Sequence, residues 1–116
     1  MTSYTPTPKL LYTSQPFAFS QPAALAALAA LHGVGTAPLE TARVLELGCA
    51  SGGNIIPLAA RFPRASFTGI DIEDGAIAAG RGRASALGLT NIQLEAADIV
   101  DFAERKQEFD YIICHG

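Results

Sequence analysis

The segment Arg43-Val44-Leu45-Glu46-Leu47-Gly48-Cys49-Ala50-Ser51-Gly52-Gly53-Asn54 is the most informative part of this chain of 116 residues about its fold. Its first five residues are a short, mostly apolar run, which is typical of a strand covered on both faces. The run breaks into a glycine-rich turn, and residues 54–61 are then predicted to be a helix. Pro57 is tolerated there because it lies in about the first helical turn. The stretch therefore predicts a strand, a tight turn and a helix in succession.

The same alternation continues toward the C-terminus. Further elements are expected as follows: strands at 66–72, 91–96 and 110–114, a helix at 74–87 closed by Gly88, and a short irregular or helical segment around 102–106. Strands that alternate with helices at this rhythm predict a parallel sheet with right-handed crossovers. We therefore expect the α/β class, with a Rossmann-like doubly wound parallel sheet that is truncated after the fourth strand.

The N-terminal part differs in composition. Residues 1–21 are rich in Thr, Ser and Pro and predict an extended arm. Pro22 suits the first turn of a helix, and Gly33 is a natural stop for it. Three leucines recur at a spacing of three and predict a narrow apolar stripe that packs on something larger: Leu25, Leu28 and Leu31. We expect two parts, an arm and helix at 1–33 and a half-domain at 34–116.

Composition excludes several classes of function. Eight Lys+Arg against eleven Asp+Glu give a net charge of −3, which offers no basic surface for nucleic acid or an anionic membrane. The longest apolar stretch, 22–31, has ten residues, about half of what a spanning helix needs. Cys49 and Cys114 are too few for a disulfide scaffold and lack the spacing of a metal site. We expect two buried free thiols in a cytoplasmic protein.

Ligands of doubly wound sheets bind outside the carboxyl ends of the strands. One interpretation of the glycine turn is a weakened dinucleotide fingerprint, Gly48-x-Ala50-x-x-Gly53, with Asp71 about 20 residues further on. Two residues argue against it. Ala50 stands where backbone must approach a pyrophosphate, and Glu46 would direct a carboxylate toward the phosphates.

A cationic ligand fits the same residues better. S-adenosylmethionine (SAM) carries a sulfonium and an ammonium group and no phosphate, so Glu46 can act on its ammonium group directly or through water. Asp71 can accept both ribose hydroxyls, since a carboxylate has paired acceptor oxygens. Asp98 can accept from the adenine amino group, while Ile72 and Ile99 offer apolar faces to the ring.

These motifs resemble those of class I SAM-dependent methyltransferases. Residues 44–54 look like their first motif, usually of the form VLELGCGxGGN, although Ala50 replaces a frequent glycine, for which we expect a modest cost in affinity. Three further stretches resemble the second, third and fourth motifs: Gly69-Ile70-Asp71-Ile72, Ala97-Asp98-Ile99 and Phe109-Asp110-Tyr111-Ile112-Ile113. The resemblance implies a SAM site formed by Glu46, Gly48, Cys49, Ala50, Gly52, Asn54, Asp71, Ile72, Asp98, Ile99 and His115.

A closer resemblance covers Gln15-Pro16-Phe17 through Leu31, the stretch 52–59 and the stretch 111–116. It is to bacterial methyltransferases that carry a C-terminal regulatory domain, some of which methylate protein lysines. It implies a methyltransferase whose acceptor is a protein, for example at a lysine, or a small molecule. A non-catalytic SAM-binding or interaction module is the alternative function, and an NAD-dependent oxidoreductase domain is the third.

The resemblance also implies that part of the sheet is missing, because the complete fold has seven strands. We expect the 116 residues alone to be catalytically silent. We also expect them to self-associate through the apolar fourth strand, in which Tyr111, Ile112 and Ile113 would form an exposed edge.

Overall fold

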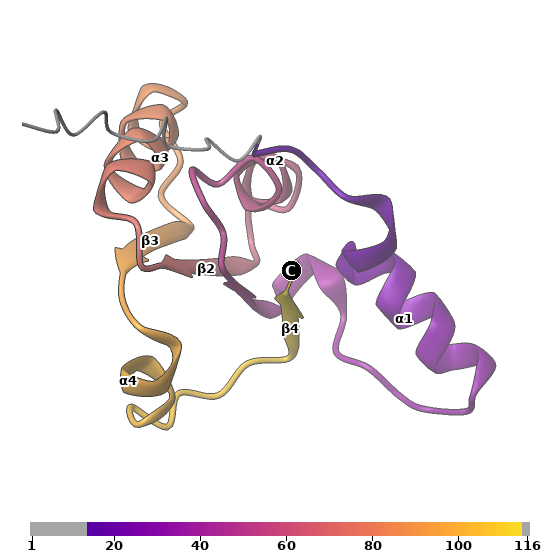
Figure 1. Cartoon of the computed structure of the whole chain (residues 1–116). Helices are drawn as coiled ribbons and strands as arrows, with labels where there is room; N and C mark the ends of the chain where they lie inside the picture. The colour runs from indigo at the N-terminus through magenta and orange to yellow at the C-terminus, as the bar shows by residue number, and fades with distance from the viewer. Residues whose placement is uncertain (1–13, 115–116) are drawn as a thin grey trace, which may run out of the picture.

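A computed structural model describes residues 14–114 of the chain (Figure 1). The expectations for residues 1–13 of the arm and for His115 lie outside the described residues. Within residues 14–114, no helix is both long and apolar enough to cross a membrane.

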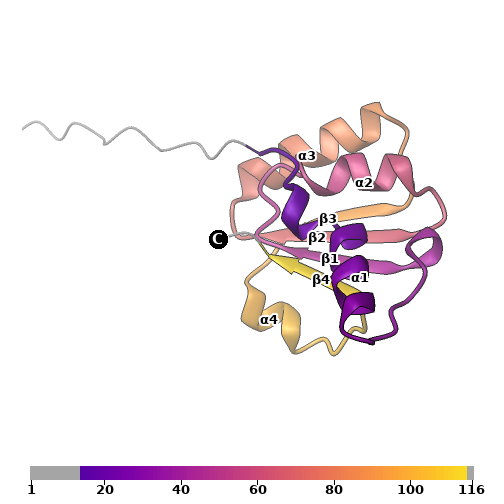
Figure 2. The same ribbon diagram turned by 90° about the vertical axis from the view of Figure 1, so that its right-hand side faces the viewer.

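The centre of the molecule is a parallel sheet, as the alternation predicts. It consists of four strands in the spatial order β3-β2-β1-β4: β1 (Arg43–Leu47), β2 (Ser66–Asp71), β3 (Ile92–Ala96) and β4 (Tyr111–Cys114). From β1 the chain moves outward through β2 to β3, and then returns to place β4 on the other side of β1 (Figure 2). The strand order therefore reverses between β1 and β4, and the Rossmann-like α/β fold is confirmed.

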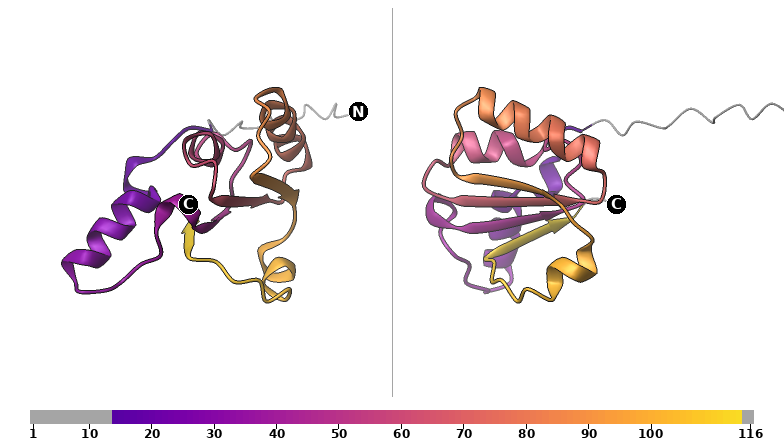
Figure 3. Two further views of the ribbon diagram at one scale, coloured as in Figure 1. Left: turned by 180° about the vertical axis from the view of Figure 1, so that it is seen from behind. Right: turned by 90° about the vertical axis from the view of Figure 1, so that its left-hand side faces the viewer.

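Helices cover the two faces of the sheet unequally. Helices α2 (Ile55–Arg61) and α3 (Asp74–Ala86) lie on one face, and the short α4 (Ile99–Ala103) lies on the other (Figure 3). Helix α1 (Pro22–Leu31) lies beside the β1–β4 side of the sheet (Figure 1). Side chains of β1 alternate between the two faces. Val44 belongs to the large core under α2 and α3, whereas Leu45 packs with Ile70 and Phe102 under α4.

Element boundaries differ from the expected ones by a few residues. The helix expected from residue 54 begins at Ile55, and the helix expected to end at residue 87 ends at Ala86. The largest shift is in the segment expected around 102–106, which is helical earlier, at Ile99–Ala103. Its start is set by Asp98, whose Oδ1 accepts a hydrogen bond from the backbone N of Val100 at 2.7 Å.

Two expectations about burial are wrong. The leucine stripe of α1 packs on the core only at Leu25, while Leu28 is 55% exposed and Leu31 83% exposed. Cys114 was expected in the core and is exposed. Burial alternates along β4, so that Tyr111 and Ile113 face the large core while Ile112 and Cys114 face the side that α4 covers only in part.

Candidate cofactor-binding site

The turn that follows β1 has an unusual backbone. Gly48, Ala50 and Gly52 have φ angles of 69°, 50° and 82°, in the left-handed region. Two of these positions are therefore suited to glycine, and Ala50 adopts a conformation that is unfavourable for a residue with a Cβ. The backbone N of Cys49 donates to the carbonyl oxygen of Ile70 at 3.0 Å, which ties the turn to β2.

Two glycines of neighbouring elements allow close approach to this turn. At Gly69 of β2, an added Cβ would lie 2.9 Å from the sulfur of Cys49, and at Gly80 of α3 it would lie 2.8 Å from the carbonyl oxygen of Ser51. Both distances are shorter than ordinary contacts. The glycine in the middle of α3, which is unfavourable for a helix, thus has a packing reason.

Asp71 lies at the end of β2 and contacts the turn directly. Its Oδ2 accepts from the backbone N of Ala50 at 2.9 Å, and its Oδ1 accepts from the backbone N of Glu73 at 2.9 Å. Each carboxylate oxygen has a second lone pair, so Asp71 can still accept from two hydroxyl groups. The structure thus brings Asp71 and the glycine turn together, as the motif spacing predicts.

Glu46 is the most unusual ionisable group of the site. Its side chain is 2% exposed, and its Oε2 accepts from Nδ2 of Asn54 at 2.6 Å. Its Oε1 is also buried and has no hydrogen-bond donor among the described residues. Burial raises the pKa of Glu46 to about 7, against the opposing effect of the hydrogen bond from Asn54. A buried carboxylate oxygen without a donor is unfavourable, and a cationic ligand would satisfy it.

The N-terminal segment contributes contacts that the sequence did not predict. The backbone N of Phe17 and the Nε2 of Gln21 donate to Oδ1 of Asn54 at 3.0 and 2.6 Å. The Oγ of Ser14 accepts from the backbone N of Gly53 at 2.6 Å. Residues 14–21 therefore lie against the start of α2. The only sequence signal for this was the resemblance that includes Gln15-Pro16-Phe17, which says nothing about contacts.

The third acidic residue has a structural role of its own. Asp98 follows β3 and caps α4 through Val100, which leaves its second oxygen for another donor. Ile72 and Ile99, which follow β2 and β3, are exposed large apolar side chains. Exposed isoleucines at two adjacent strand ends provide apolar surface where a planar ring can bind.

Cys49 is buried in the turn, and its thiol is not poised for chemistry. Burial, together with the nearby carboxylates of Glu46 and Asp71, raises the pKa of Cys49 to about 12. The thiol therefore stays protonated, and Cys49 serves as a small side chain that fits against Gly69. Within residues 14–114, no group of three or more His, Cys, Asp or Glu side chains could hold a metal ion.

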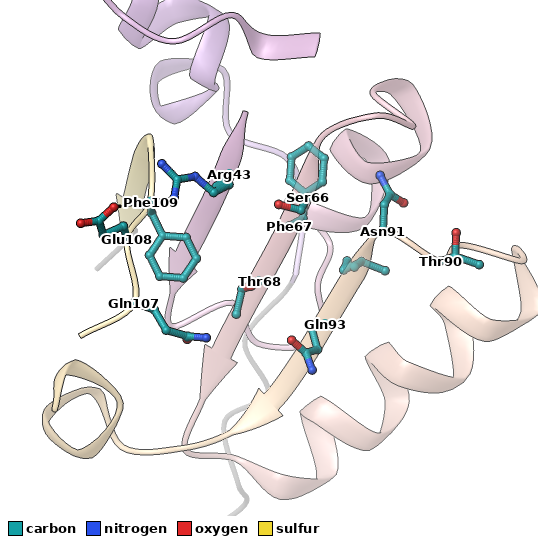
Figure 4. A pocket seen from close by; sticks show the side chains of 11 residues that line it. Arg43, Ser66, Phe67, Thr68, Thr90, Asn91, Gln93, Gln107, Glu108 and Phe109 are labelled. Atoms are coloured by element: carbon teal, nitrogen blue, oxygen red, sulfur yellow. Dashed lines mark ion pairs between the residues drawn. The ribbon is translucent and has the colours of Figure 1, made fainter. Parts of the chain in front are cut away.

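A cavity of about 530 Å³ lies elsewhere, at the amino ends of the strands (Figure 4). It is lined by Arg43, Ser66, Phe67, Thr68, Thr90, Asn91, Ile92, Gln93, Gln107, Glu108 and Phe109. None of these residues belongs to the predicted site, which lies at the carboxyl ends. The cavity is therefore a separate feature of the opposite edge of the sheet.

The sequence of this chain is similar to those of known methyltransferases. A family model described as a methyltransferase domain matches residues 39–116. The protein RP789 of Rickettsia prowazekii is 41% identical over 113 residues, which are 97% of this chain and 20% of RP789. A trans-aconitate 2-methyltransferase of Variovorax paradoxus is 37% identical over 77 residues, which are 66% of this chain and 28% of that enzyme.

A solved structure is similar to this chain in both fold and sequence. PKMT2 from Rickettsia typhi, in complex with AdoHcy (S-adenosylhomocysteine), superposes with a TM-score of 0.86 at 34% identity, over 91% of this chain and 20% of PKMT2. The chain thus spans about a fifth of the length of RP789 and of PKMT2.

Proposed function

Because this chain belongs to the methyltransferase-domain family of class I SAM-dependent enzymes, we propose that it is the cofactor-binding part of an enzyme that transfers a methyl group from SAM. The observation that carries the proposal is the Glu46 carboxylate, which is buried beside the glycine turn and keeps one oxygen without a donor among the described residues. An ammonium group would supply that donor, whereas a phosphate would be repelled. The residues therefore fit SAM.

Each residue of the proposed site has a role that follows from its position. Glu46, with Asn54 beside it, holds the ammonium group, while the turn residues Gly48, Cys49, Ala50 and Gly52 let the backbone lie close to the amino-acid end of SAM. Asp71 accepts from the ribose hydroxyls. Asp98 accepts from the adenine amino group, and Ile72 and Ile99 contact the ring. We also assign His115, which follows β4, to this site.

When bound, SAM supplies a methyl carbon bonded to a positively charged sulfur. The contribution of this chain is to hold that group in a fixed orientation, because methyl transfer depends largely on alignment with the acceptor. Glu46 lies in β1 just before the glycine turn, and Asp71 ends the neighbouring strand β2 and contacts the turn at Ala50. They can hold the amino-acid end and the ribose at the same time. No residue of the site is assigned as an acid or a base.

The acceptor we favour is a protein lysine. A protein lysine is an acceptor that the resemblance to bacterial methyltransferases with a C-terminal regulatory domain implies, and PKMT2 matches 91% of this chain, whereas the relative named for the small molecule trans-aconitate matches 66% of it. We divide the chain at residue 33 into an arm with a helix and a SAM-binding half-domain. We further propose a cytoplasmic location, which suits a chain with only two cysteines, and self-association through β4.

Titration calorimetry with SAM, S-adenosylhomocysteine and NAD tests the proposed cofactor. We expect both SAM-type ligands to bind more tightly than NAD. Glu46→Gln should lower the affinities for both SAM-type ligands, while the control Glu40→Gln, at an exposed position, should leave these affinities unchanged. Tighter binding of NAD would overturn the assignment. Because we expect the 116 residues alone to be catalytically silent, the acceptor is tested in a longer protein that carries this chain, by incubation with labelled SAM and a panel of proteins and small carboxylic acids. Label on a protein lysine supports the proposal, and label confined to a small acid contradicts it.

A further inference from the structure

A chain of hydrogen bonds links the N-terminal segment to the carboxylate of the site. Gln21 donates through Nε2 to Oδ1 of Asn54 at 2.6 Å, and Asn54 donates through Nδ2 to Oε2 of Glu46 at 2.6 Å. The backbone N of Phe17 donates to the same Oδ1 at 3.0 Å. Asn54 and Glu46 are both buried. The bond from Asn54 to Glu46 is therefore out of reach of bulk water, and hydrogen bonds are stronger in such an environment, whereas the bonds from Gln21 and Phe17 to Asn54 are partly buried.

The direction of these hydrogen bonds is determined by chemistry. A backbone N–H can only donate, so the Asn54 atom that faces Phe17 must be the amide oxygen. The amide nitrogen of Asn54 then necessarily faces Glu46, which as a carboxylate can only accept. If the amide were reversed, its oxygen would face the carboxylate and its nitrogen would face two donors. Gln21 and Phe17 together thus hold Asn54 in one orientation.

This orientation decides which oxygen of Glu46 remains for a ligand. Because Asn54 donates to Oε2, the side chain of Glu46 is held with Oε1 buried and without a donor among the described residues. Without the amide of Gln21, Asn54 would lose one of its two donors, and the carboxylate could adopt other orientations.

The position of Gln21 is itself well defined. It immediately precedes α1, whose first residue, Pro22, is buried, and its Nε2 also donates to the carbonyl oxygen of Phe17 at 3.2 Å. A second contact holds the segment at Gly53, where an added Cβ would overlap the backbone of Ser14 and Gln15. Helix α1 can therefore transmit its placement to the site.

We propose that Gln21 is a positioning residue of the SAM site, which orients Asn54 so that Glu46 presents Oε1 to the ammonium group of the ligand. The proposal rests on the proposed function. It adds a residue outside the methyltransferase motifs, and it gives the N-terminal helix a role in ligand selectivity. Gln21 is not expected to touch the ligand.

Two ligands separate this role from a merely structural one. S-adenosylhomocysteine carries the ammonium group, whereas 5′-methylthioadenosine has the same nucleoside and sulfur without the amino-acid end. Gln21→Met keeps the side-chain length but removes the donor. We expect this variant to lower the affinity for S-adenosylhomocysteine about tenfold and to change the affinity for 5′-methylthioadenosine by less than about twofold. Gln107→Met, at an exposed loop position on the opposite edge of the sheet, is the matched control and should change neither affinity.

A double-mutant cycle tests whether Gln21 acts through Glu46. In a Glu46→Gln background, Gln21→Met should change the affinity for S-adenosylhomocysteine by less than about twofold, because the carboxylate that it positions is gone. Circular dichroism checks that each variant is folded, and Gln21→Glu, which also lacks the donor, replaces Gln21→Met if that variant does not fold.

Each result is decisive. The role of Gln21 would be overturned if Gln21→Met lowered the affinities for both ligands equally, if it lowered neither affinity, or if its effect were additive with that of Glu46→Gln. Each of these results would leave the proposed function standing. A wild-type chain that binds neither ligand would overturn the proposed function and this inference with it.

Discussion

The carboxylate of Asp71 accepts a hydrogen bond from the backbone N of Ala50 at 2.9 Å, so the end of β2 holds the turn that follows β1. This contact occurs in the middle of the proposed site. Asp71 therefore has two functions in the proposal: it stabilises the glycine turn, and it accepts from the ribose of the ligand. Hydrogen bonds to a charged group contribute about 1.5–3 kcal/mol each, so both functions are large enough to measure.

Asp71→Ala should lower the affinity for S-adenosylhomocysteine at least about tenfold, because the ribose loses a charged acceptor. It should also lower the melting temperature, because the backbone N of Ala50 loses its partner. Calorimetry and thermal denaturation measure the two effects. Asp74→Ala, at an exposed position of α3, is the control for binding and should leave the affinity unchanged. An unchanged dissociation constant for Asp71→Ala would place the ligand elsewhere.

Ala50→Gly should relieve the left-handed backbone of the turn, where Ala50 has a φ of 50°. The relief is about 1–2 kcal/mol, and the greater freedom of glycine in the unfolded chain offsets about 0.5–1 kcal/mol of it. We expect a free energy of unfolding that is equal or up to about 1.5 kcal/mol higher, together with slightly tighter binding of SAM. Chemical denaturation and calorimetry measure both. A clear loss of stability would mean that the methyl group of Ala50 makes a favourable contact.

Stability should depend on pH through Glu46. Burial raises the pKa of this carboxyl from 4.5 to about 7. The folded chain therefore binds the proton more tightly than the unfolded chain does. The resulting stabilisation is complete below pH 4.5 and is lost as the pH rises through about 7, by roughly 3 kcal/mol at most. Denaturation at a series of pH values measures it, and Glu46→Gln should remove this part of the slope.

Ligand binding should show the opposite trend. The ammonium group of S-adenosylhomocysteine favours the ionised form of Glu46, so its affinity should rise as the pH increases through about 7. The affinity for 5′-methylthioadenosine, without that group, should not rise. If Glu46→Gln kept the full pH dependence of both stability and affinity, another group would be responsible.

Two glycines of α3 should respond to alanine in opposite directions. At Gly80 an added Cβ would lie 2.7 Å from Leu94 and 2.8 Å from the carbonyl oxygen of Ser51, so Gly80→Ala should destabilise by about 1–3 kcal/mol and displace the turn. At Gly82 an added Cβ would meet nothing within 4 Å, so Gly82→Ala should stabilise the helix by up to about 1 kcal/mol. Denaturation of the two variants measures the contrast. Equal effects would contradict the close packing of α3 on the turn.

Self-association through β4 should depend on Ile112. Within residues 14–114, β4 pairs with a strand on one side only, and Ile112 is its exposed large apolar side chain, at 58%. Ile112→Lys should shift the chain toward monomer in light scattering, because a lysine on an edge strand disfavours pairing. Val34→Lys replaces an equally exposed apolar residue in a loop and should leave association unchanged. A monomeric wild-type chain would contradict the proposed association.

The parallel sheet and the neighbourhood of the site could be predicted from the sequence. Strand and helix periods are local properties, and the carboxyl ends of parallel strands meet at one edge of a sheet. For this reason the positions of Asp71 and Asp98 at the strand ends, and the glycine turn beside Glu46, followed from spacing alone. The predicted boundaries of β1 agree with the structure to the residue, and its end was marked by the glycine turn that begins at Gly48.

The contacts between side chains could not be predicted in this way, because they depend on how distant segments pack. Gln21 and Ser14 lie more than 30 residues from Asn54 and Gly53, and no local pattern brings such distant residues together. The exposure of Cys114 and of two leucines of α1 depends on which neighbouring elements cover them, which their own spacing does not express. The lack of a donor at one oxygen of Glu46, among the described residues, also depends on which neighbouring elements surround it. Local periodicity specifies the elements and their order, whereas packing between distant segments specifies hydrogen-bond partners and burial.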